Sequence, residues 1–275
     1  MYPILSTDEI RRIKKAVDTN KSEITTSFDL GLSKVKITLN KEGFVHEKKT
    51  IALPKLRDSD DVCYALIDGD LKKVQFMGED TRFLYKLVPT SNRPILQVSG
   101  TGMHKRPFVD RVEKDKLQGI ILDTGTGLGY TAIQEAKTAK QVITVEMDPN
   151  IIEVARYNPY SQDIFTNKKI KIIIADITEE IKNFKNEEFD NIILDAGTPR
   201  SSGTFFSTPN YKQAFRVLKK GGRLYHYLPK HHEKRGRDFP GEVINRMEHI
   251  GFILIERNDA GSYSIFGKSL NNSSH

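Results

Sequence analysis

The sequence has few of the features that mark secreted or membrane-bound proteins. Cys63 is the only cysteine in 275 residues, so the chain can form neither an intrachain disulfide nor a cysteine-based metal cluster. No apolar run approaches the roughly 18–20 residues needed to cross a bilayer. The first residues also lack the basic segment and apolar core of a signal peptide. We therefore expect a cytoplasmic protein with no membrane partner and no bound metal.

The chain is instead rich in charge, with a positive balance. It has 43 Lys and Arg residues against 36 Asp and Glu residues, a formal net charge of +7. Hydrophobic residues make up 37% and charged residues 29%, as in a soluble globular protein. A basic surface is compatible with a nucleic-acid partner, but basic composition also arises without one. Charge alone leaves both readings open.

The pattern of the chain changes near residue 100. Residues 6–17 predict an amphipathic helix, opened by the capping-box pair Ser6 and Glu9. Short β-rich runs separated by turn residues follow it, at residues 24–28, 35–39, 62–67, 71–77, 82–88 and 95–98. We predict a small β-rich N-terminal domain over residues 1–100. It could bind substrate directly or serve as a dimerisation or lid module, and the sequence does not indicate an oligomeric state.

Strands and helices alternate in the remainder, residues 101–275, which is typical of an α/β fold with a parallel sheet. The predicted strands are residues 119–123, 141–146, 170–176, 189–195 and 221–228. The predicted helices are residues 130–139, 150–156, 177–184, 210–218 and 241–250. Two last strands, at residues 252–257 and 262–268, are joined by a short turn and should pair antiparallel. The expected sheet has five parallel strands plus a C-terminal hairpin.

Residues 121–136, ILDTGTGLGYTAIQEA, form a strand, a glycine turn and a helix start, the layout of a nucleotide-binding crossover. The turn spaces Gly125, Gly127 and Gly129 as Gly-x-Gly-x-Gly, whereas a dinucleotide site uses Gly-x-Gly-x-x-Gly. Asp123 stands two residues before the first glycine. A carboxylate there would repel a pyrophosphate and attract the ammonium group of a methionine moiety. The motif favours S-adenosylmethionine (SAM) over NAD.

Each of the first four predicted strands ends in an acid, and parallel strands present these ends at one edge of a sheet. One such acid is more often a helix cap, but four in register suggest a binding edge. Asp123 suits the ammonium group, Glu146 the ribose hydroxyls and Asp176 the adenine amino group, while Asp195 lies where a substrate should approach. Met147 and Ile177 could sandwich the adenine or belong to the core. The predicted cofactor-binding residues are Asp123, Gly125, Thr126, Gly127, Gly129, Glu146, Met147, Asp176 and Ile177.

Three stretches, LDTGTGLGYTAIQEA, VITVEMDPNIIEVARYNPYS and RVLKKGGRLYHY, carry a family resemblance. They resemble archaeal SAM-dependent methyltransferases of the Rossmann-like class I, and the likeness extends back through TSFDLGLS and VSGTGMH. It implies methyl transfer, with Asp123, Gly125, Gly127, Glu146 and Asp176 matching the cofactor motifs. It further implies RNA modification, in ribosomal or transfer RNA, at an exocyclic base amine such as cytidine N4 of ribosomal RNA.

The chain departs from the amine-directed pattern after the fourth strand. Such enzymes usually carry Asp/Asn-Pro-Pro there, whereas here Asp195 is followed by Ala196 and Gly197. Asp195 is the predicted catalytic residue, which accepts a hydrogen bond from the target N–H. Without the prolines the loop is less rigid, which leaves an altered substrate or a reduced activity open. The absence of a cysteine near this site argues against methylation at a pyrimidine C5, which usually needs a thiolate.

Aromatic and basic residues near the same edge predict contacts with RNA. Phe205 and Phe206 could stack on an extruded base, and the basic segment 230–237, KHHEKRGR, could contact phosphates. The alternatives are a core position for the aromatic rings and an ordinary solvated surface for the segment. His104 could cap the substrate pocket, although a single loop histidine is more often structural. The predicted substrate-binding residues are His104, Arg200, Phe205, Phe206, Lys234, Arg235 and Arg237.

Two other functions stay open. Aminopropyl transfer, as in spermidine synthases, shares this fold and a small β domain in front of it. It needs several acids to hold a polycation, whereas residues 195–199 offer one acid and residues 230–237 would repel a polyamine. The second alternative is a non-catalytic, SAM- and RNA-binding ribosome-assembly factor that retains the fold.

Overall fold

The computed structural model describes residues 2–102, 106–195, 203–228 and 238–270. The chain forms two compact units. The first comprises residues 1–104 and 150–162, and the second comprises residues 105–149 and 163–275. A single boundary near residue 100 does not account for residues 150–162. The chain passes from the second unit to the first after the second parallel strand, and back to the second unit before the third parallel strand.

The first unit is built mainly from short antiparallel strands. Its elements are β1 (Ile4–Ser6), α1 (Thr7–Asp18), β2 (Glu23–Thr26), β3 (Val35–Thr38), β4 (Gly43–His46), β5 (Lys49–Ala52), β6 (Cys63–Ile67), β7 (Asp70–Lys73), β8 (Gln75–Met77), β9 (Leu84–Val88), β10 (Ile95–Val98), β11 (Thr101–Gly102), α4 (Pro149–Tyr157) and η1 (Pro159–Ser161). Its sheets run in the orders β1-β6-β7 and β11-β10-β9-β8, with two hairpins, β2-β3 and β4-β5.

The capping box predicted for helix α1 is confirmed: Ser6 is its N-cap, and the Ser6 side chain accepts a hydrogen bond from the Glu9 amide at 3.1 Å. Ile10 and Ile13 of this helix are buried in a core with Phe44. The sequence did not predict strands β1, β4 and β5. The predicted run 71–77 divides into β7 and β8, which belong to different sheets.

The second unit contains one seven-stranded sheet and the helices that cover it. Its elements are α2 (Arg106–Asp115), β12 (Ile120–Thr124), α3 (Tyr130–Ala136), β13 (Gln141–Glu146), α5 (Asp163–Thr166), β14 (Ile170–Ile174), α6 (Ile177–Glu180), η2 (Ile181–Asn183), β15 (Phe189–Leu194), α7 (Thr208–Val217), β16 (Leu218–Tyr227), α8 (Phe239–Ile250), β17 (Phe252–Asn258) and β18 (Tyr263–Lys268). Helix α2 was not predicted, although Phe108 and Val112 already have helical spacing in the sequence.

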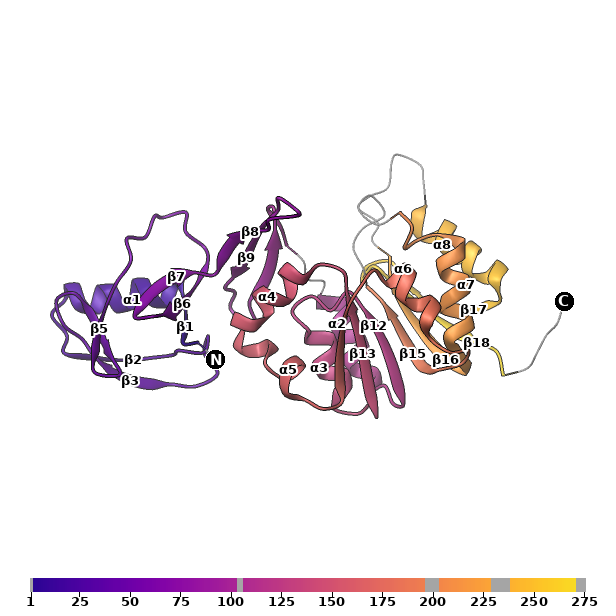
Figure 1. Cartoon of the computed structure of the whole chain (residues 1–275), viewed down its shortest axis with the longest axis horizontal. Coiled ribbons are helices and arrows are strands. Elements are labelled where there is room, and N and C mark those ends of the chain that lie inside the picture. The colour runs from indigo at the N-terminus through magenta and orange to yellow at the C-terminus, as the bar shows by residue number, and fades with distance from the viewer. Residues whose placement is uncertain (1, 103–105, 196–202, 229–237, 271–275) are drawn as a thin grey trace. The chain divides into compact units, whose positions relative to one another are not determined.

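The sheet runs in the order β14-β13-β12-β15-β16-β18-β17 (Figure 1). The first five strands are parallel, and β18 and β17 pair antiparallel with β16 and with each other. This confirms the predicted sheet of five parallel strands and a C-terminal hairpin. Strand order reverses direction between β12 and β15, and ligands bind at the carboxyl ends of the strands beside such a switch point.

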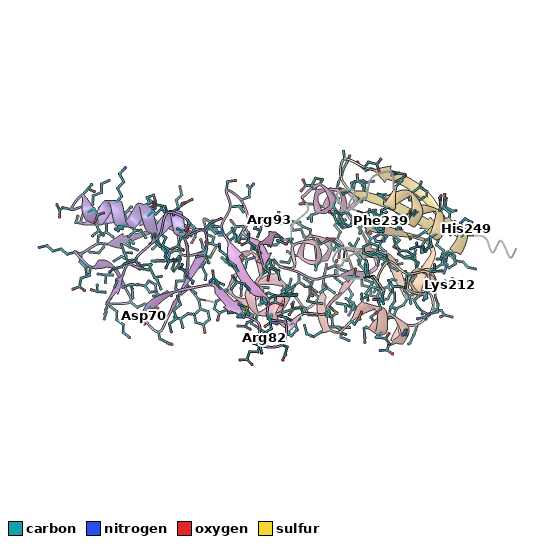
Figure 2. The ribbon with its side chains drawn as sticks, turned by 90° about the horizontal axis from the view of Figure 1, so that it is seen from above. Asp70, Arg82, Arg93, Lys212, Phe239 and His249 are labelled. Carbon is teal, nitrogen blue, oxygen red and sulfur yellow. The ribbon has the colours of Figure 1, made fainter. Side chains whose placement is uncertain are left out.

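Alternate side chains of the strands enter two cores, one on each face of the sheet. Leu122 and Ile192 pack with helices α6, α7 and α8, and Ile121 and Ile193 pack with α2 and α3. The opposite sides of the covering helices carry exposed polar residues, such as His249 on α8 (Figure 2). None of the helices in the described ranges combines the length and apolar character that a membrane crossing requires.

Candidate active site

The carboxyl ends of β12, β13 and β15 bring three of the predicted acids together. Thr124 is in register with Val145 and with Leu194, so Asp123, Glu146 and Asp195 occupy adjacent strand ends. Their proximity has an electrostatic effect, because the negative charges of Asp195 and Glu146 both raise the pKa of Asp123.

The loop from Gly125 to Gly129 is fixed by its own backbone and by Glu146. The Gly125 amide donates to the Val145 carbonyl at 2.8 Å, and the Gly129 amide donates to the Thr126 carbonyl at 2.7 Å. The Glu146 carboxylate accepts from the amides of Gly127, at 3.0 Å, and Asp148, at 3.1 Å. Glu146 therefore orders the glycine loop in addition to ending β13, a role that the sequence did not predict.

Asp123 lies under this loop and is only 2% exposed. Its Oδ2 atom accepts a hydrogen bond from the Thr144 hydroxyl at 2.8 Å, and the Thr126 and Thr144 hydroxyls are 2.7 Å apart. Burial is the main cause that raises the pKa of Asp123, to about 7. Thr144 was missed in the sequence analysis, although a threonine within the apolar strand QVITVE is a visible signal for a buried polar contact.

Of the residues predicted to bind the adenine, Asp176 and Met147 are exposed, whereas Ile177 is buried. Asp176 caps helix α6, where its Oδ1 accepts from the Thr178 amide and hydroxyl at 2.8 Å. Its side chain is exposed, so it remains accessible to a ligand. Met147 is 64% exposed at the end of β13, but Ile177 is 6% exposed and packs in the core. The adenine sandwich predicted from Met147 and Ile177 is therefore wrong for Ile177, whose side chain has no open face.

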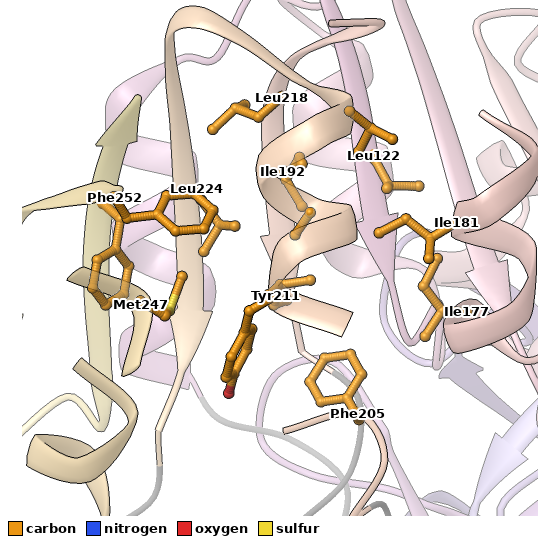
Figure 3. Packing of buried hydrophobic residues seen from close by; sticks show 14 of the residues in the cluster. Leu122, Ile177, Ile181, Ile192, Phe205, Tyr211, Leu218, Leu224, Met247 and Phe252 are labelled. Carbon is orange, nitrogen blue, oxygen red and sulfur yellow. The ribbon is translucent and has the colours of Figure 1, made fainter. Parts of the chain in front are cut away.

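The prediction that Phe205 and Phe206 form a base-stacking platform is also wrong. They are 2% and 5% exposed and belong to the core cluster that includes Tyr211 (Figure 3). Base stacking requires an open ring face, whereas Phe206 is stacked on the buried His226 ring at a centroid distance of 5.5 Å. Tyr225 of β16 is also a core residue, with no exposed surface.

A buried hydrogen-bonded chain holds the end of β15, next to Asp195. The His226 Nδ1 atom is 3.2 Å from the Leu194 carbonyl oxygen, and Nε2 is 2.9 Å from the Tyr211 hydroxyl. A carbonyl only accepts, so Nδ1–H donates to it and Nε2 accepts from Tyr211. Burial lowers the pKa of His226 to about 3, which keeps the ring neutral. On the other side, the Asp195 amide donates to the Thr124 hydroxyl at 3.1 Å.

The substitution Tyr211→Phe should destabilise the protein by about 1–3 kcal/mol, because it leaves the buried Nε2 atom of His226 without a donor. Urea unfolding would measure the change. Ser264→Ala is the matched control: Ser264 pairs with His226 in the sheet, and its buried hydroxyl has no partner among the described residues. Its removal should leave the stability unchanged or slightly higher. Equal losses in both variants would contradict this reading of the His226 chain.

Several predicted residues lie outside the described ranges. These are His104, Arg200, Lys234, Arg235 and Arg237, together with Ala196 and Gly197 of the departure after Asp195. Their predicted roles stay predictions from the sequence.

The sequence is similar to that of known proteins. Residues 116–249 match the family described as a methyltransferase domain. The chain is also 35% identical over 266 residues to an uncharacterized protein of Methanocaldococcus jannaschii. The aligned region covers 89% of each chain. The chain belongs to the same family as the Methanocaldococcus jannaschii protein, and its residues 116–249 form a methyltransferase domain. Its cofactor is S-adenosyl-L-methionine.

Two further similarities concern part of the chain or its fold alone. A polyamine aminopropyltransferase of Sulfurisphaera tokodaii is 31% identical over 107 residues, which is 37% of this chain and 35% of that protein. The spermidine synthase structure from Thermotoga maritima has a TM-score of 0.53 at 18% identity and covers 70% of both chains. At that identity the likeness shows a shared fold.

The residues of the site fit SAM. A Cβ placed on Gly127 would meet nothing closer than the Gly125 carbonyl oxygen at 3.8 Å, so the loop leaves open space against its backbone. Asp123 is buried beneath the loop and would bind the ammonium group directly or through water, whereas Asp176 and Met147 are accessible at the neighbouring strand ends. These residues would hold the cofactor, with Glu146 fixing the loop.

Proposed function

We propose that this methyltransferase transfers the methyl group of SAM to an exocyclic amine of a base in RNA, such as cytidine N4 of ribosomal RNA. The observation that carries the proposal is the position of Asp195, whose carboxyl group lies near enough to Asp123 to raise the pKa of that group. A hydrogen-bond acceptor therefore lies beside the acid that would hold the cofactor, where a target N–H must approach.

The protein has little covalent chemistry to perform. SAM supplies an electrophilic methyl group, so the chain needs to align an acceptor nitrogen and receive the proton that the nitrogen loses. Asp195 accepts a hydrogen bond from the target N–H, which keeps the nitrogen lone pair directed at the methyl group, and then receives that proton. The backbone contacts at Leu194 and Thr124 hold Asp195 in place during this step.

Charge supports RNA as the substrate. The net charge is +7, and the segment KHHEKRGR follows β16, which ends at the same edge of the sheet as β12 and β15. Lysine and arginine side chains placed there would contact the phosphates on either side of the target nucleotide. The alternative for this segment, a solvated surface, predicts RNA binding that does not depend on it.

Replacing Lys234, Arg235 and Arg237 together by glutamine should weaken RNA binding at least about tenfold at 0.15 M salt. It should also reduce the salt dependence of log Kd by about 2, because up to three phosphate contacts are lost. Affinity for SAM should not change. The matched control replaces the exposed Lys137, Lys140 and Lys168, which precede β13 and β14 at the opposite edge, and should bind RNA normally. Filter binding over a salt series measures both; equal effects would exclude a specific role for the segment.

Aminopropyl transfer is the second candidate, favoured by the similarity to the Sulfurisphaera tokodaii aminopropyltransferase over part of this chain. A polyamine acceptor needs several carboxylates that are free to ionise. Glu146 is instead engaged by two loop amides, and burial raises the pKa of Asp123 to about 7. The observed acids therefore suit one ammonium group better than a polycation.

One experiment separates these functions. The protein is incubated with SAM labelled in its methyl group and with separated cellular RNA, protein and small-molecule fractions, and in parallel with decarboxylated SAM and putrescine. Label in an N-methylated base of RNA is the expected result. Product only from decarboxylated SAM would establish aminopropyl transfer. SAM binding with no transfer to any fraction would favour a non-catalytic RNA-binding factor.

A further inference from the structure

Glu135, on helix α3, is a buried acid that takes no part in the proposed methyl transfer. It is 3% exposed, and neither oxygen of its carboxyl group has a hydrogen-bond partner among the described residues. An ionised carboxylate in such a place costs far more than a neutral acid. Burial accordingly raises the pKa of Glu135 well above its usual value, and the negative charge of Asp123 raises it further. Burial therefore favours the neutral, protonated form of Glu135.

The groups that face Asp123 come from three elements besides its own strand, and they are acids or hydroxyls. Glu135 lies on α3, Glu146 and Thr144 lie on β13, and Asp195 follows β15. The Thr144 hydroxyl is the one partner that favours the ionised form of Asp123, whereas burial and the charges of Asp195 and Glu146 oppose it. Among the described residues, no lysine or arginine is among the groups that shift the pKa of Asp123 or Glu135.

Neighbouring buried carboxylates with no cation beside them among the described residues are costly to ionise, and a cation that binds there removes part of that cost. We propose that Asp123 and Glu135 both carry protons in the free protein, and that the ammonium group of SAM expels the proton of Asp123 while Glu135 remains neutral. The proton leaves to solvent, and the bound pair is one carboxylate and one ammonium. Glu135 keeps the pocket from holding two adjacent negative charges, so it is a positioning residue for the charge on Asp123.

This inference depends on the cofactor and not on the RNA substrate, so it can fail while the proposed function holds. It predicts that SAM binds more tightly as pH rises, because deprotonating Asp123 no longer opposes binding. The gain should level off above a pH of about 7. The α-amino group of SAM itself loses its proton above a pH of about 7.7. The informative range therefore lies at and below neutral pH.

Calorimetric titration of the full-length protein with SAM, in buffers of different ionisation enthalpy, counts the protons released. With a pKa of about 7 for Asp123, we expect roughly three quarters of a proton per SAM bound at pH 6.5. S-adenosylhomocysteine, which keeps the ammonium group, should release the same number. Methylthioadenosine, which lacks it, should release none. Zero release with SAM, or equal release with methylthioadenosine, would overturn the proposal.

Two variants assign the protons. Asp123→Asn should bind SAM at least tenfold more weakly and release no proton. Glutamine resembles the neutral form of Glu135, so Glu135→Gln should bind SAM normally. Its effect is therefore measured as the change of the free energy of unfolding with pH. The folded-state pKa of Glu135 is raised, so the wild type binds more protons folded than unfolded and loses stability as pH rises above about 4.5. Glu135→Gln should lose less between pH 5 and 8, whereas Glu179→Gln on exposed α6 should follow the wild type. An unchanged slope in Glu135→Gln would show that Glu135 does not hold a proton.

Discussion

The substitution Asp195→Asn should lower the rate of methyl transfer to RNA by at least about a hundredfold. A positioned proton acceptor typically contributes a factor of about 10² to 10⁴, and asparagine keeps the shape of aspartate without its basic oxygen. SAM affinity at neutral pH should stay equal to that of the wild type or rise, because the charge of Asp195 raises the pKa of Asp123. Single-turnover transfer and calorimetric SAM binding measure the two effects separately.

The split between rate and affinity is what makes this test specific. The exposed Asp163 at the start of α5 provides a matched control, since Asp163→Asn removes the same charge from the same unit. It should leave both quantities unchanged. If Asp195→Asn transferred methyl groups at the wild-type rate, the acceptor for the substrate proton would have to be another group.

Alanine at Gly129 and at Gly127 should have opposite consequences, although both glycines belong to the same loop. At Gly129 the backbone has φ +77°, and an added Cβ would lie 2.3 Å from Ile164 Cγ2 and 3.1 Å from Cδ1. The left-handed conformation and the overpacking together should cost about 2–5 kcal/mol. Gly129→Ala should therefore unfold at a clearly lower urea concentration.

At Gly127 the backbone has φ +56°, and the nearest atom to an added Cβ is 3.8 Å away. The folded protein should lose only about 1–2 kcal/mol, from the left-handed conformation. The added methyl group would instead occupy the space where the cofactor approaches the backbone, so SAM affinity should fall at least about tenfold. Urea unfolding and SAM titration of both variants test the pair. Normal SAM binding by Gly127→Ala would show that the cofactor does not approach this part of the loop.

The two predictions concern different parts of one edge of the sheet. The glycine loop and the acids beneath it fit a cofactor with a positive charge, and we propose that the substrate approaches the end of β15. Two hydrogen bonds hold the end of β15: His226 Nδ1 donates to the Leu194 carbonyl, and the Asp195 amide donates to the Thr124 hydroxyl.

The sheet of the second unit was predictable because local patterns determine it. Alternating strands and helices imply parallel pairing, and a short turn before the last strand implies a hairpin, so the sheet of the second unit follows from the order of elements. The assignment of residues 150–162 to the first unit was not predictable. It depends on contacts with residues more than a hundred positions earlier, such as the 3.3 Å hydrogen bond from the Tyr160 hydroxyl to the Leu30 carbonyl.

The sequence by itself determined the cofactor class, because the spacing of Gly125, Gly127 and Gly129 and the acid at position 123 are local features with direct chemical meaning. Only the tertiary structure decided which polar and aromatic residues are exposed to a ligand. Burial depends on neighbours from other elements. Phe206 therefore stacks on a histidine of β16 instead of a base, and Glu135 is buried without a hydrogen-bond partner among the described residues, where the charge of Asp123 raises its pKa.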